Sequence, residues 1–339
     1  MTPTLERVAL DDVRWRSFAD DRSDVSIFHR PQWSALLAGT YGYDAFAIIA
    51  TRQQRTIAGA PFLSVGGPFR RRWSSLPFTD ACAPLGDPEA VDLFVGGLLD
   101  QAAGAGISSV ELRCDLSRVA GHARTVGVSH TLPLTGGTEA ATRRISAAHA
   151  RNVRQARRHG VEVSLGRDPD DMEAFYDLHL RTRRRLGVPA QPIRFFRQLA
   201  QFIVAPGLGF IALARIGSQP IAAAVFLSSG STLVYKYGAS DEREWLHRPN
   251  DALFQTVIED ACHRGYAALD FGRTDIDDAG LRRFKSSWGA AESELRYTTL
   301  GQPVELGSRL AVNILAPVIR RSSPLVCRAI GEALYRYSA

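Results

Sequence analysis

The segment GLRRFKSSWG, residues 280–289, contains a lysine, Lys285, in a chain whose basic residues are nearly all arginines. Lys285 and Lys236 are the two lysines of the sequence, and the other 39 of its 41 basic residues are arginines. A lysine ammonium is a compact charge on a flexible stem, whereas an arginine presents a planar fork, so the two stabilise negative charge differently. Phe284 and Trp288 are expected to anchor one face of a helical turn and to leave Lys285 on another side. Lys285 is therefore the first candidate for chemistry.

Two further segments in the second half combine aromatic and charged residues. Tyr235, Lys236 and Tyr237 alternate along a predicted strand, so both tyrosines should face one way and the lysine the other. The two tyrosines either pack as ordinary strand residues or present their hydroxyls to a bound ligand. Asp270 and Arg273 end an apolar strand, and ligands gather at the carboxyl ends of such strands in α/β proteins. The alternative for this pair is a salt bridge between neighbours.

A run of arginines lies in the middle of the chain, in RRISAAHARNVRQARRHGVEV. The pattern predicts one basic helix over residues 143–158 that Gly160 ends. Arg151, Arg154 and Arg158 fall on one face of this helix. The run is either a solvated surface or a site for an anion, because like charges without counterions repel one another. The net charge of +6 favours an anionic partner as well.

Standard catalytic and metal-binding motifs are missing from the sequence. It contains no serine nucleophile elbow, no phosphate-binding Walker loop and no His/Cys spacing typical of zinc, so no metal or resident cofactor is expected. The string QAAGAG (101–106) resembles a glycine-rich pyrophosphate loop, but it closes a predicted helix instead of opening one. Gly104 and Gly106 are therefore interpreted as residues of a helix end and a turn.

The order of predicted elements repeats. Residues 45–65 and 209–229 each predict a hairpin, and each is followed by a strand, a loop, a helix and another strand. This order predicts a duplicated α/β unit, with a first domain over 1–140 and a second over 141–301. The tail, 302–339, should form helices that dock on the body of the protein or lie as a peripheral contact on an anionic membrane. No leader or spanning segment is recognised, so a cytoplasmic location is expected.

Several motifs together resemble the FemAB-like group of the GNAT acetyltransferase superfamily, which includes Fem-type aminoacyltransferases and BioF2-like acetyltransferases. In order, within residues 25–300, they are FHRPQW, LPFTDACAPLG, RNVRQARRHGVEV, a T-x-x-R that ends at Arg185, YKYGAS, RPNDALFQ, DFGRT and RFKSSWG. The resemblance implies an α/β fold of two tandem GNAT-like (acyl-CoA N-acyltransferase fold) domains with mixed sheets flanked by helices. It also implies transfer of an acyl group, often from aminoacyl-tRNA, to an amine.

The resemblance assigns roles to particular residues. Lys285 would lie at the transfer centre, with Asp80, Arg185, Tyr235 and Tyr237 on the acceptor side. The first domain would hold the acceptor and the second the donor end. From its charge, the basic helix is expected to contact either the phosphates of tRNA or an anionic acceptor. We expect an acceptor amine on a cell-wall precursor, a small peptide or a natural product.

Two departures from the Fem pattern weaken a cell-wall substrate. No basic residue follows Trp33 closely, and the segment 136–160 leaves no room for a coiled-coil insertion. Two alternatives stay open at this stage: a GNAT-type acetyltransferase that uses acyl-CoA, and a noncatalytic protein that binds a precursor or polysaccharide.

Overall fold

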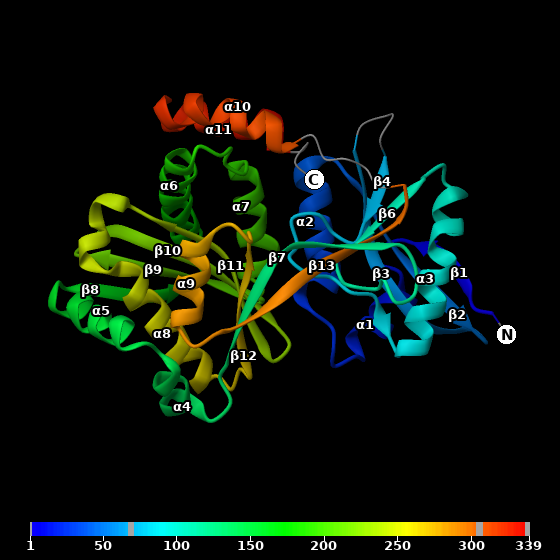
Figure 1. Cartoon of the computed structure of the whole chain (residues 1–339), viewed down its shortest axis with the longest axis horizontal. Coiled ribbons are helices and arrows are strands. Elements are labelled where there is room, and N and C mark those ends of the chain that lie inside the picture. Colours follow the sequence, from blue (N-terminus) through cyan, green and yellow to red (C-terminus); the bar gives the residue numbers. More distant parts are fainter. Residues whose placement is uncertain (1, 67–70, 303–307, 336–339) are drawn as a thin grey trace. The chain divides into compact units, whose positions relative to one another are not determined.

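The computed structural model describes residues 2–66, 71–302 and 308–335 and divides into two compact units (Figure 1). Unit 1 comprises Met1–Gly127 and Glu294–Leu306, and unit 2 comprises Val128–Ser293 and Gly307–Ser338. Two strands, β7 (His122–Pro133) and β13 (Ala291–Gly301), begin in one unit and end in the other. The domain limits at 140 and 301 remain sequence predictions.

Unit 1 is a mixed sheet with helices on both faces. Its strands lie in the order β1-β2-β3-β4-β6-β13, and the pair β4–β6 is parallel. Helix α3 covers one face, and helices α1 and α2 pack against β2 and β3 on the other. The elements are β1 (Thr4–Val8), α1 (Val13–Asp20), η1 (Ile27–His29), α2 (Pro31–Tyr41), β2 (Asp44–Arg52), β3 (Arg55–Val65), β4 (Arg72–Ser74), β5 (Leu85–Gly86), α3 (Pro88–Ala103) and β6 (Ser109–Leu112).

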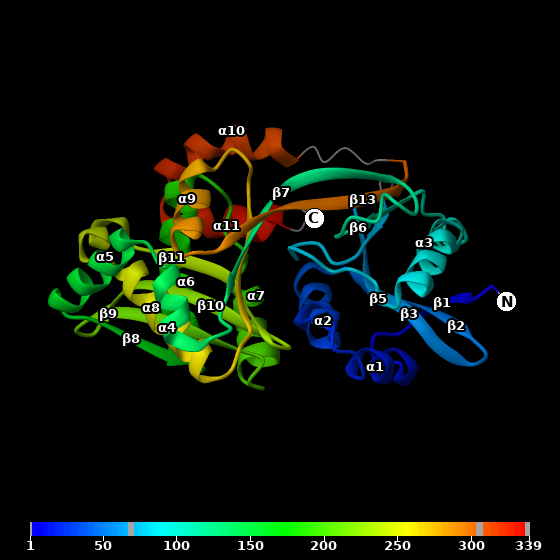
Figure 2. The same ribbon diagram turned by 60° about the horizontal axis from the view of Figure 1, so that its bottom comes forward.

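Unit 2 repeats this plan around strands in the order β7-β12-β11-β10-β9-β8. Helix α8 covers one face with α4 and α5, while α6 and α7 cover the other (Figure 2). The elements are α4 (Gly137–Arg144), α5 (Ala147–Arg158), β8 (Val161–Gly166), α6 (Pro169–Leu186), α7 (Ile193–Leu199), η2 (Ala200–Val204), β9 (Gly209–Ile216), β10 (Gln219–Ser229), β11 (Thr232–Ser240), η3 (Glu242–His247), α8 (Pro249–His263), β12 (Ala268–Thr274), α9 (Ala279–Ser287), α10 (Ser308–Arg321) and α11 (Pro324–Leu334).

The predicted duplication is confirmed element by element. The hairpin β2–β3 corresponds to β9–β10, and in both units a strand, a helix and a parallel strand follow. Ala58 and Ala60 lie in the core beneath α3, as Ala222 and Ala224 do beneath α8. These small side chains let the helix approach the sheet closely, which explains why both hairpins carry them at matching places.

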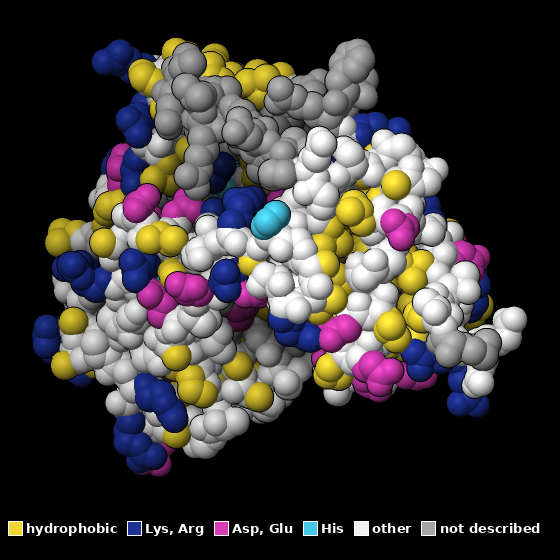
Figure 3. Space-filling model, turned by 45° about the vertical axis from the view of Figure 1, so that its right-hand side comes forward, with side chains coloured by type: hydrophobic (Ala, Val, Ile, Leu, Met, Phe, Trp, Pro, Cys, Tyr) yellow, Lys and Arg dark blue, Asp and Glu magenta, His cyan; other side chains and the backbone are white. Residues whose placement is uncertain are grey.

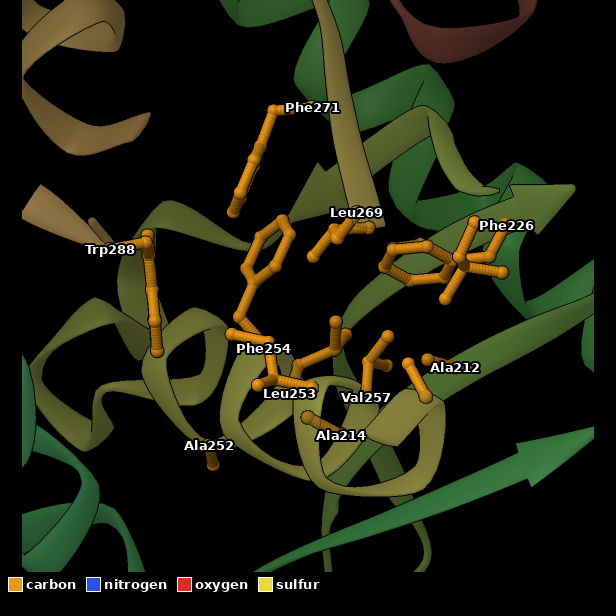
Figure 4. Close-up of a cluster of buried hydrophobic side chains, with 14 of the residues drawn as sticks. Ala212, Ala214, Phe226, Ala252, Leu253, Phe254, Val257, Leu269, Phe271 and Trp288 are labelled. Atoms are coloured by element: carbon orange, nitrogen blue, oxygen red, sulfur yellow. The ribbon is translucent and has the colours of Figure 1, made fainter. Parts of the chain in front are cut away.

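The core of unit 2 is aromatic at its centre (Figure 4). Phe254 of α8 lies between Phe271 of β12, at 5.3 Å between ring centroids, and Trp288, at 5.8 Å. Phe284 and Trp288 therefore do anchor α9, as their spacing predicts. Because truncation of a buried phenylalanine to alanine costs about 3–5 kcal/mol, this cluster fixes where α9 can lie.

The basic segment forms two helices instead of the single helix predicted. Helix α4 ends at Arg144 and α5 begins at Ala147, because the Ser146 side chain caps the amide of His149 and starts a new helix. The tail docks on the body of unit 2, where α10 and α11 contact α6 and bury Ile319 and Cys327. Within the described residues, the helices are too short or too polar to cross a bilayer.

Candidate active site

Strands β11 and β12 separate along their length. They pair in parallel from Thr232 and Ala268 to Val234 and Asp270, although β11 continues to Ser240 and β12 to Thr274. At the point of separation β11 also bulges, because Tyr235 pairs with Phe226 and Tyr237 pairs with the preceding residue of β10. A bulge places one extra residue in a strand and turns the side chains beyond it. Beyond Val234 and Asp270 the two strands no longer pair with each other.

The bulge overturns the expectation that Tyr235 and Tyr237 face the same way. Tyr235 packs in the α8 core, with its ring 5.0 Å from that of Phe254. Tyr237 packs on the opposite face, with its ring 5.4 Å from that of Phe196 in α7. The extra residue, Lys236, breaks the alternation on which the prediction rested.

Burial raises the pKa of Tyr235 to about 12, so its hydroxyl stays protonated at neutral pH. The hydroxyl lies beside Gly238, where it fills the space that a side-chain carbon would need. Gly238 is thus the residue type that this strand requires while Tyr235 is present.

Lys285 is buried, with 2% of its surface exposed, and it lies against the separated end of β12. Its Nζ donates to the carbonyl oxygens of Gly272 at 2.8 Å and Arg273 at 3.2 Å. Gly272 has φ of +67°, a left-handed conformation that glycine adopts without strain, and the β12–β7 register shifts at the same place. The local break in β12 therefore frees the carbonyls that hold the ammonium.

A histidine shares this environment. His130 of β7 is fully buried, and its Nε2 lies 3.1 Å from Glu292 Oε2. Burial lowers the pKa of His130, and the charges of Lys285 and Arg282 lower it further against the opposing effect of Glu292. The imidazole is neutral at pH 7 as a result, so Lys285 carries the positive charge at this position.

The other candidates from the second half occupy nearby positions of unit 2. Asp270 accepts hydrogen bonds from Ser129 Oγ at 3.3 Å and the Gly272 amide at 2.8 Å, so it supports the break in β12. The Arg273 side chain pairs with Asp275 at 2.6 Å. Arg185 of α6 lies 3.6 Å from Glu242 and has its guanidinium 4.8 Å from the centroid of the Trp245 ring.

Asp80 belongs to unit 1, where its main-chain carbonyl accepts from the Tyr297 hydroxyl at 2.8 Å. Arg151, Arg154 and Arg158 are exposed on α5, opposite the buried Val153 and Ala156. Basic side chains on the face shown in Figure 3 lie in several separate groups with acidic ones among them. An anion would therefore meet local clusters, of which α5 supplies one.

Three side chains that the sequence did not reveal form a chain of hydrogen bonds beside α9. His149 Nδ1 contacts the carboxylate of Asp251, and His149 Nε2 lies 2.7 Å from Ser287 Oγ. The imidazole stacks on Trp288 with ring centroids 4.3 Å apart. His149 is more than 100 positions from both Asp251 and Ser287, so no local motif indicates the three residues. A lone histidine within the arginine-rich helix is the one signal.

The tautomer of His149 follows from its neighbours. A carboxylate can only accept, so His149 carries a proton on Nδ1, which donates to Asp251. The Ser287 hydroxyl also lies 2.8 Å from the carbonyl of Phe284. This arrangement joins α5, α8 and the last turn of α9, and so it fixes the helix that carries Lys285.

The segment between β11 and α8 is acidic. It contains Asp241, Glu242 and Glu244 and no glycine from 241 to 248. The pKa of Asp241 is lowered, above all by hydrogen bonds from the Arg243 side chain, which outweigh the effect of burial. Asp241 Oδ2 also accepts from Arg181 at 2.8 Å. Helix α8 then begins at Pro249, and Asp251 in its first turn is occupied by His149. This segment offers carboxylates where a pyrophosphate would need amides.

Residues 147–286 match the acetyltransferase (GNAT) domain family. The fold is also found in solved structures. FemX has a TM-score of 0.69 at 14% identity, covering 92% of this chain and 100% of that one. The L-PGS of Bacillus licheniformis has a TM-score of 0.59 at 14% identity, covering 93% and 99%. A tandem GNAT protein from the clavulanic acid biosynthesis pathway has a TM-score of 0.52 at 11% identity, covering 89% and 100%.

At these identities the solved structures establish the fold alone, and no curated protein sequence gives a significant match. The fold is the tandem GNAT-like α/β architecture, and residues 147–286 form a GNAT acetyltransferase domain. The match of this domain supports an acyltransferase of the GNAT type. The resemblance inferred from the sequence is thus confirmed at this level. No group of His, Cys, Asp and Glu within the described part of the chain is arranged to hold a metal ion.

Proposed function

We propose that the protein is a FemAB-like N-acyltransferase that moves an aminoacyl group from aminoacyl-tRNA to an amine. One observation carries the proposal: the ammonium of Lys285 is held by two main-chain carbonyls at the separated end of β12. In an acyl transfer, negative charge develops on the attacked carbonyl oxygen, and a fixed cation stabilises it without reorganisation.

The reaction needs no covalent intermediate between the acyl group and the protein. The neutral acceptor amine attacks the carbonyl carbon of the ester, so that a C–N bond forms and an oxyanion develops. The ester C–O bond then breaks, and the proton lost by the amine is taken up by the departing ribose oxygen, which leaves as a hydroxyl. An ester is already activated, so positioning and charge stabilisation account for the rate. Lys285 serves the oxyanion or the departing oxygen.

The choice of donor rests on the segment before α8. This segment has no glycine from 241 to 248, and the carboxylates of Asp241, Glu242 and Glu244 disfavour a bound pyrophosphate. Gly104 closes α3 and Gly106 forms a turn with φ of +71°, so the other glycine-rich string is no pyrophosphate loop either. Acyl-CoA is therefore the less favoured donor.

The basic face of α5 supports a polyanionic donor. Arg151, Arg154 and Arg158 are exposed side by side on one helix, and the opposite face of that helix is buried. Phosphates of a tRNA would relieve their mutual repulsion. The likeness to FemX agrees with an aminoacyl donor. The acceptor is proposed as an amine of a small peptide, a natural product or a cell-wall precursor.

The test compares two donors in the same reaction buffer. The purified protein is incubated either with a pool of tRNAs charged with labelled amino acids or with labelled acetyl-CoA, each with a set of small amines and peptides. The label that moves into an amide is measured by chromatography. We expect transfer from charged tRNA and none above background from acetyl-CoA. Consumption of acetyl-CoA with charged tRNA left intact would overturn the choice of donor.

A further inference from the structure

A cluster of arginines lies on the sheet of unit 1. Strands β4 and β6 pair in parallel, with Trp73 opposite Val110 and Ser74 opposite Glu111. Trp73 and Val110 point into the core beneath α3. Because side chains alternate along a strand, Arg72, Ser74 and Glu111 point to the other face of the sheet.

Glu111 is the carboxylate at the centre of this cluster. It is buried, and its oxygens lie 3.3 Å from Arg113 and 3.5 Å from Arg124. Ser74 Oγ donates to it at 3.2 Å. Burial by itself raises the pKa of Glu111, but the surrounding guanidiniums, Arg113 foremost, hold it below its usual value. Glu111 is therefore ionised and already engaged by its neighbours.

Arg72 is the residue of this cluster whose side chain lacks a hydrogen-bond partner at Nη2 within residues 2–66, 71–302 and 308–335. Arg72 is 5% exposed. Burial lowers the pKa of the guanidinium, against the attraction of Glu111. A buried guanidinium nitrogen without a hydrogen-bond partner is costly, because arginine stays charged and loses part of its hydration. An oxyanion bound here would supply the missing partner.

The loop that follows β4 is held in a strained conformation next to this cluster. Leu76 and Phe78 have φ of +68° and +62°, which non-glycine residues rarely adopt. Hydrogen bonds fix the loop from several sides: Trp33 Nε1 donates to Thr79 Oγ1 at 2.9 Å, and Arg113 Nη1 donates to the Thr79 carbonyl at 2.7 Å. Strain of this kind persists where the surroundings impose it, and it gathers at binding sites.

We propose that unit 1 contains a binding site for an oxyanion with a single negative charge, a carboxylate or a phosphate diester of a small molecule, with Arg72 as its principal ligand and Arg113 beside it. The inference does not depend on which donor the protein uses.

The charges of the cluster set the charge of the ligand. Arg72, Arg113 and Arg124 are positive, while Glu111 and Asp80 are the acidic groups that act on them. Three guanidiniums against two carboxylates leave one positive charge without a counterion. Tyr43 also faces Arg72, but as a neutral phenol at pH 7. One negative charge therefore restores balance, and the forked guanidinium favours a ligand with two oxygens.

The test uses inorganic phosphate and sodium acetate as probes. Binding to the full chain is measured by calorimetry in a zwitterionic buffer at constant ionic strength, for the wild type, Arg72→Met and Arg71→Gln. Arg71 is the matched control, because it is the exposed neighbour whose side chain donates to Ser64. We expect saturable binding to the wild type, at least a tenfold loss of affinity in Arg72→Met and less than a twofold change in Arg71→Gln. The absence of saturable binding to the wild type, or equal losses in both variants, would overturn the proposal.

Thermal stability supplies a second readout that does not need the natural ligand. A structural arginine lowers the melting temperature when it is removed. An arginine kept for a ligand leaves an unpaired buried charge in the free protein, and a methionine of similar length removes that cost. We expect Arg72→Met to melt at a higher temperature than the wild type without anion, and to lose the rise that phosphate or acetate gives the wild type. A lower melting temperature for Arg72→Met would contradict the proposal, because it would show that Arg72 has structural partners.

Discussion

The hydroxyl of Tyr235 occupies the space in which a side-chain carbon at position 238 would lie. The two residues are three positions apart on β11, and the bulge at Lys236 brings them together. This relationship sets the shape of the strand at the point where it separates from β12. It also shows why the YKYGAS segment needs a glycine after its second tyrosine.

Gly238→Ala is expected to destabilise the protein by about 1–3 kcal/mol, the usual cost of inserting a methyl group into a packed site. Chemical denaturation of the purified variant measures this loss. The double variant Tyr235→Phe/Gly238→Ala removes the hydroxyl and should recover part of it. If Gly238→Ala destabilises the Tyr235→Phe variant as much as it destabilises the wild type, the Tyr235 hydroxyl and the added methyl group do not compete for this space.

The hydrogen bond between His149 and Ser287 is expected to stabilise the end of α9. Ser287→Ala should lower the free energy of unfolding by about 1 kcal/mol, the typical net value of a hydrogen bond. Ser286→Ala is the matched control, because Ser286 is exposed and surface changes usually stay within about 0.5 kcal/mol. A positioning role also predicts that Ser287→Ala reduces kcat more than KM. Identical behaviour of the two serine variants would contradict this role.

Stability should fall in mild acid because of His179. Burial, followed by the charge of Arg183, lowers the pKa of His179 to about 3, whereas an unfolded histidine titrates near about 6.5. Between pH about 3 and pH about 6.5 the unfolded chain binds a proton at His179, whereas the folded protein does not. The contribution of His179 to the free energy of unfolding is therefore complete above pH about 6.5. Below that pH it declines by up to about 1.4 kcal/mol per pH unit.

His179→Gln keeps a donor for Gln191 Oε1 and removes the titration. Denaturation curves from pH 7 to pH 5 should be flatter for this variant than for the wild type. His29 and His130 also have lowered pKa values, chiefly through burial, so a smaller slope remains. Parallel curves for the two proteins would show that His179 does not contribute.

Binding of tRNA should depend steeply on salt if α5 contacts phosphates. Replacing Arg151, Arg154 and Arg158 with glutamine should weaken binding and reduce the slope of log K against log salt by about 1 for each phosphate that is no longer neutralised. Arg118→Gln and Arg197→Gln serve as controls, because these arginines already pair with Asp92 and Glu173. An unchanged salt slope in the triple variant would place the tRNA elsewhere.

Much of the fold could be predicted because the chain repeats its own pattern. The two hairpins, their small residues and the helices after them follow from hydrophobic periodicity, which local sequence carries. The split of the basic segment into α4 and α5 could not be predicted, because charge dominates its pattern and hides the cap at Ser146. The same limit applies to the bulge in β11, since strict alternation is assumed wherever a strand is predicted.

The candidate site was predictable in part. Lys285 is conspicuous because lysine is rare in this chain, and its position next to the DFGR strand is what the motif order indicates. The contacts of His149 with Asp251 and Ser287, and the cluster around Arg72, could not be predicted. Both join residues far apart in sequence, and their properties depend on burial and on unpaired atoms that only the folded chain defines.

The central claim is that the ammonium of Lys285 stabilises the transfer step from aminoacyl-tRNA. The direct measurement is the single-turnover rate of amide formation from charged tRNA by the wild type, Lys285→Arg and the control Lys236→Arg, together with the affinity of each for tRNA. Lys285→Arg should stay folded, bind tRNA as the wild type does and transfer about 10²–10³-fold more slowly, as enzymes do when one oxyanion donor is removed. Lys236→Arg should transfer at close to the wild-type rate. Near-normal transfer by Lys285→Arg would contradict the account.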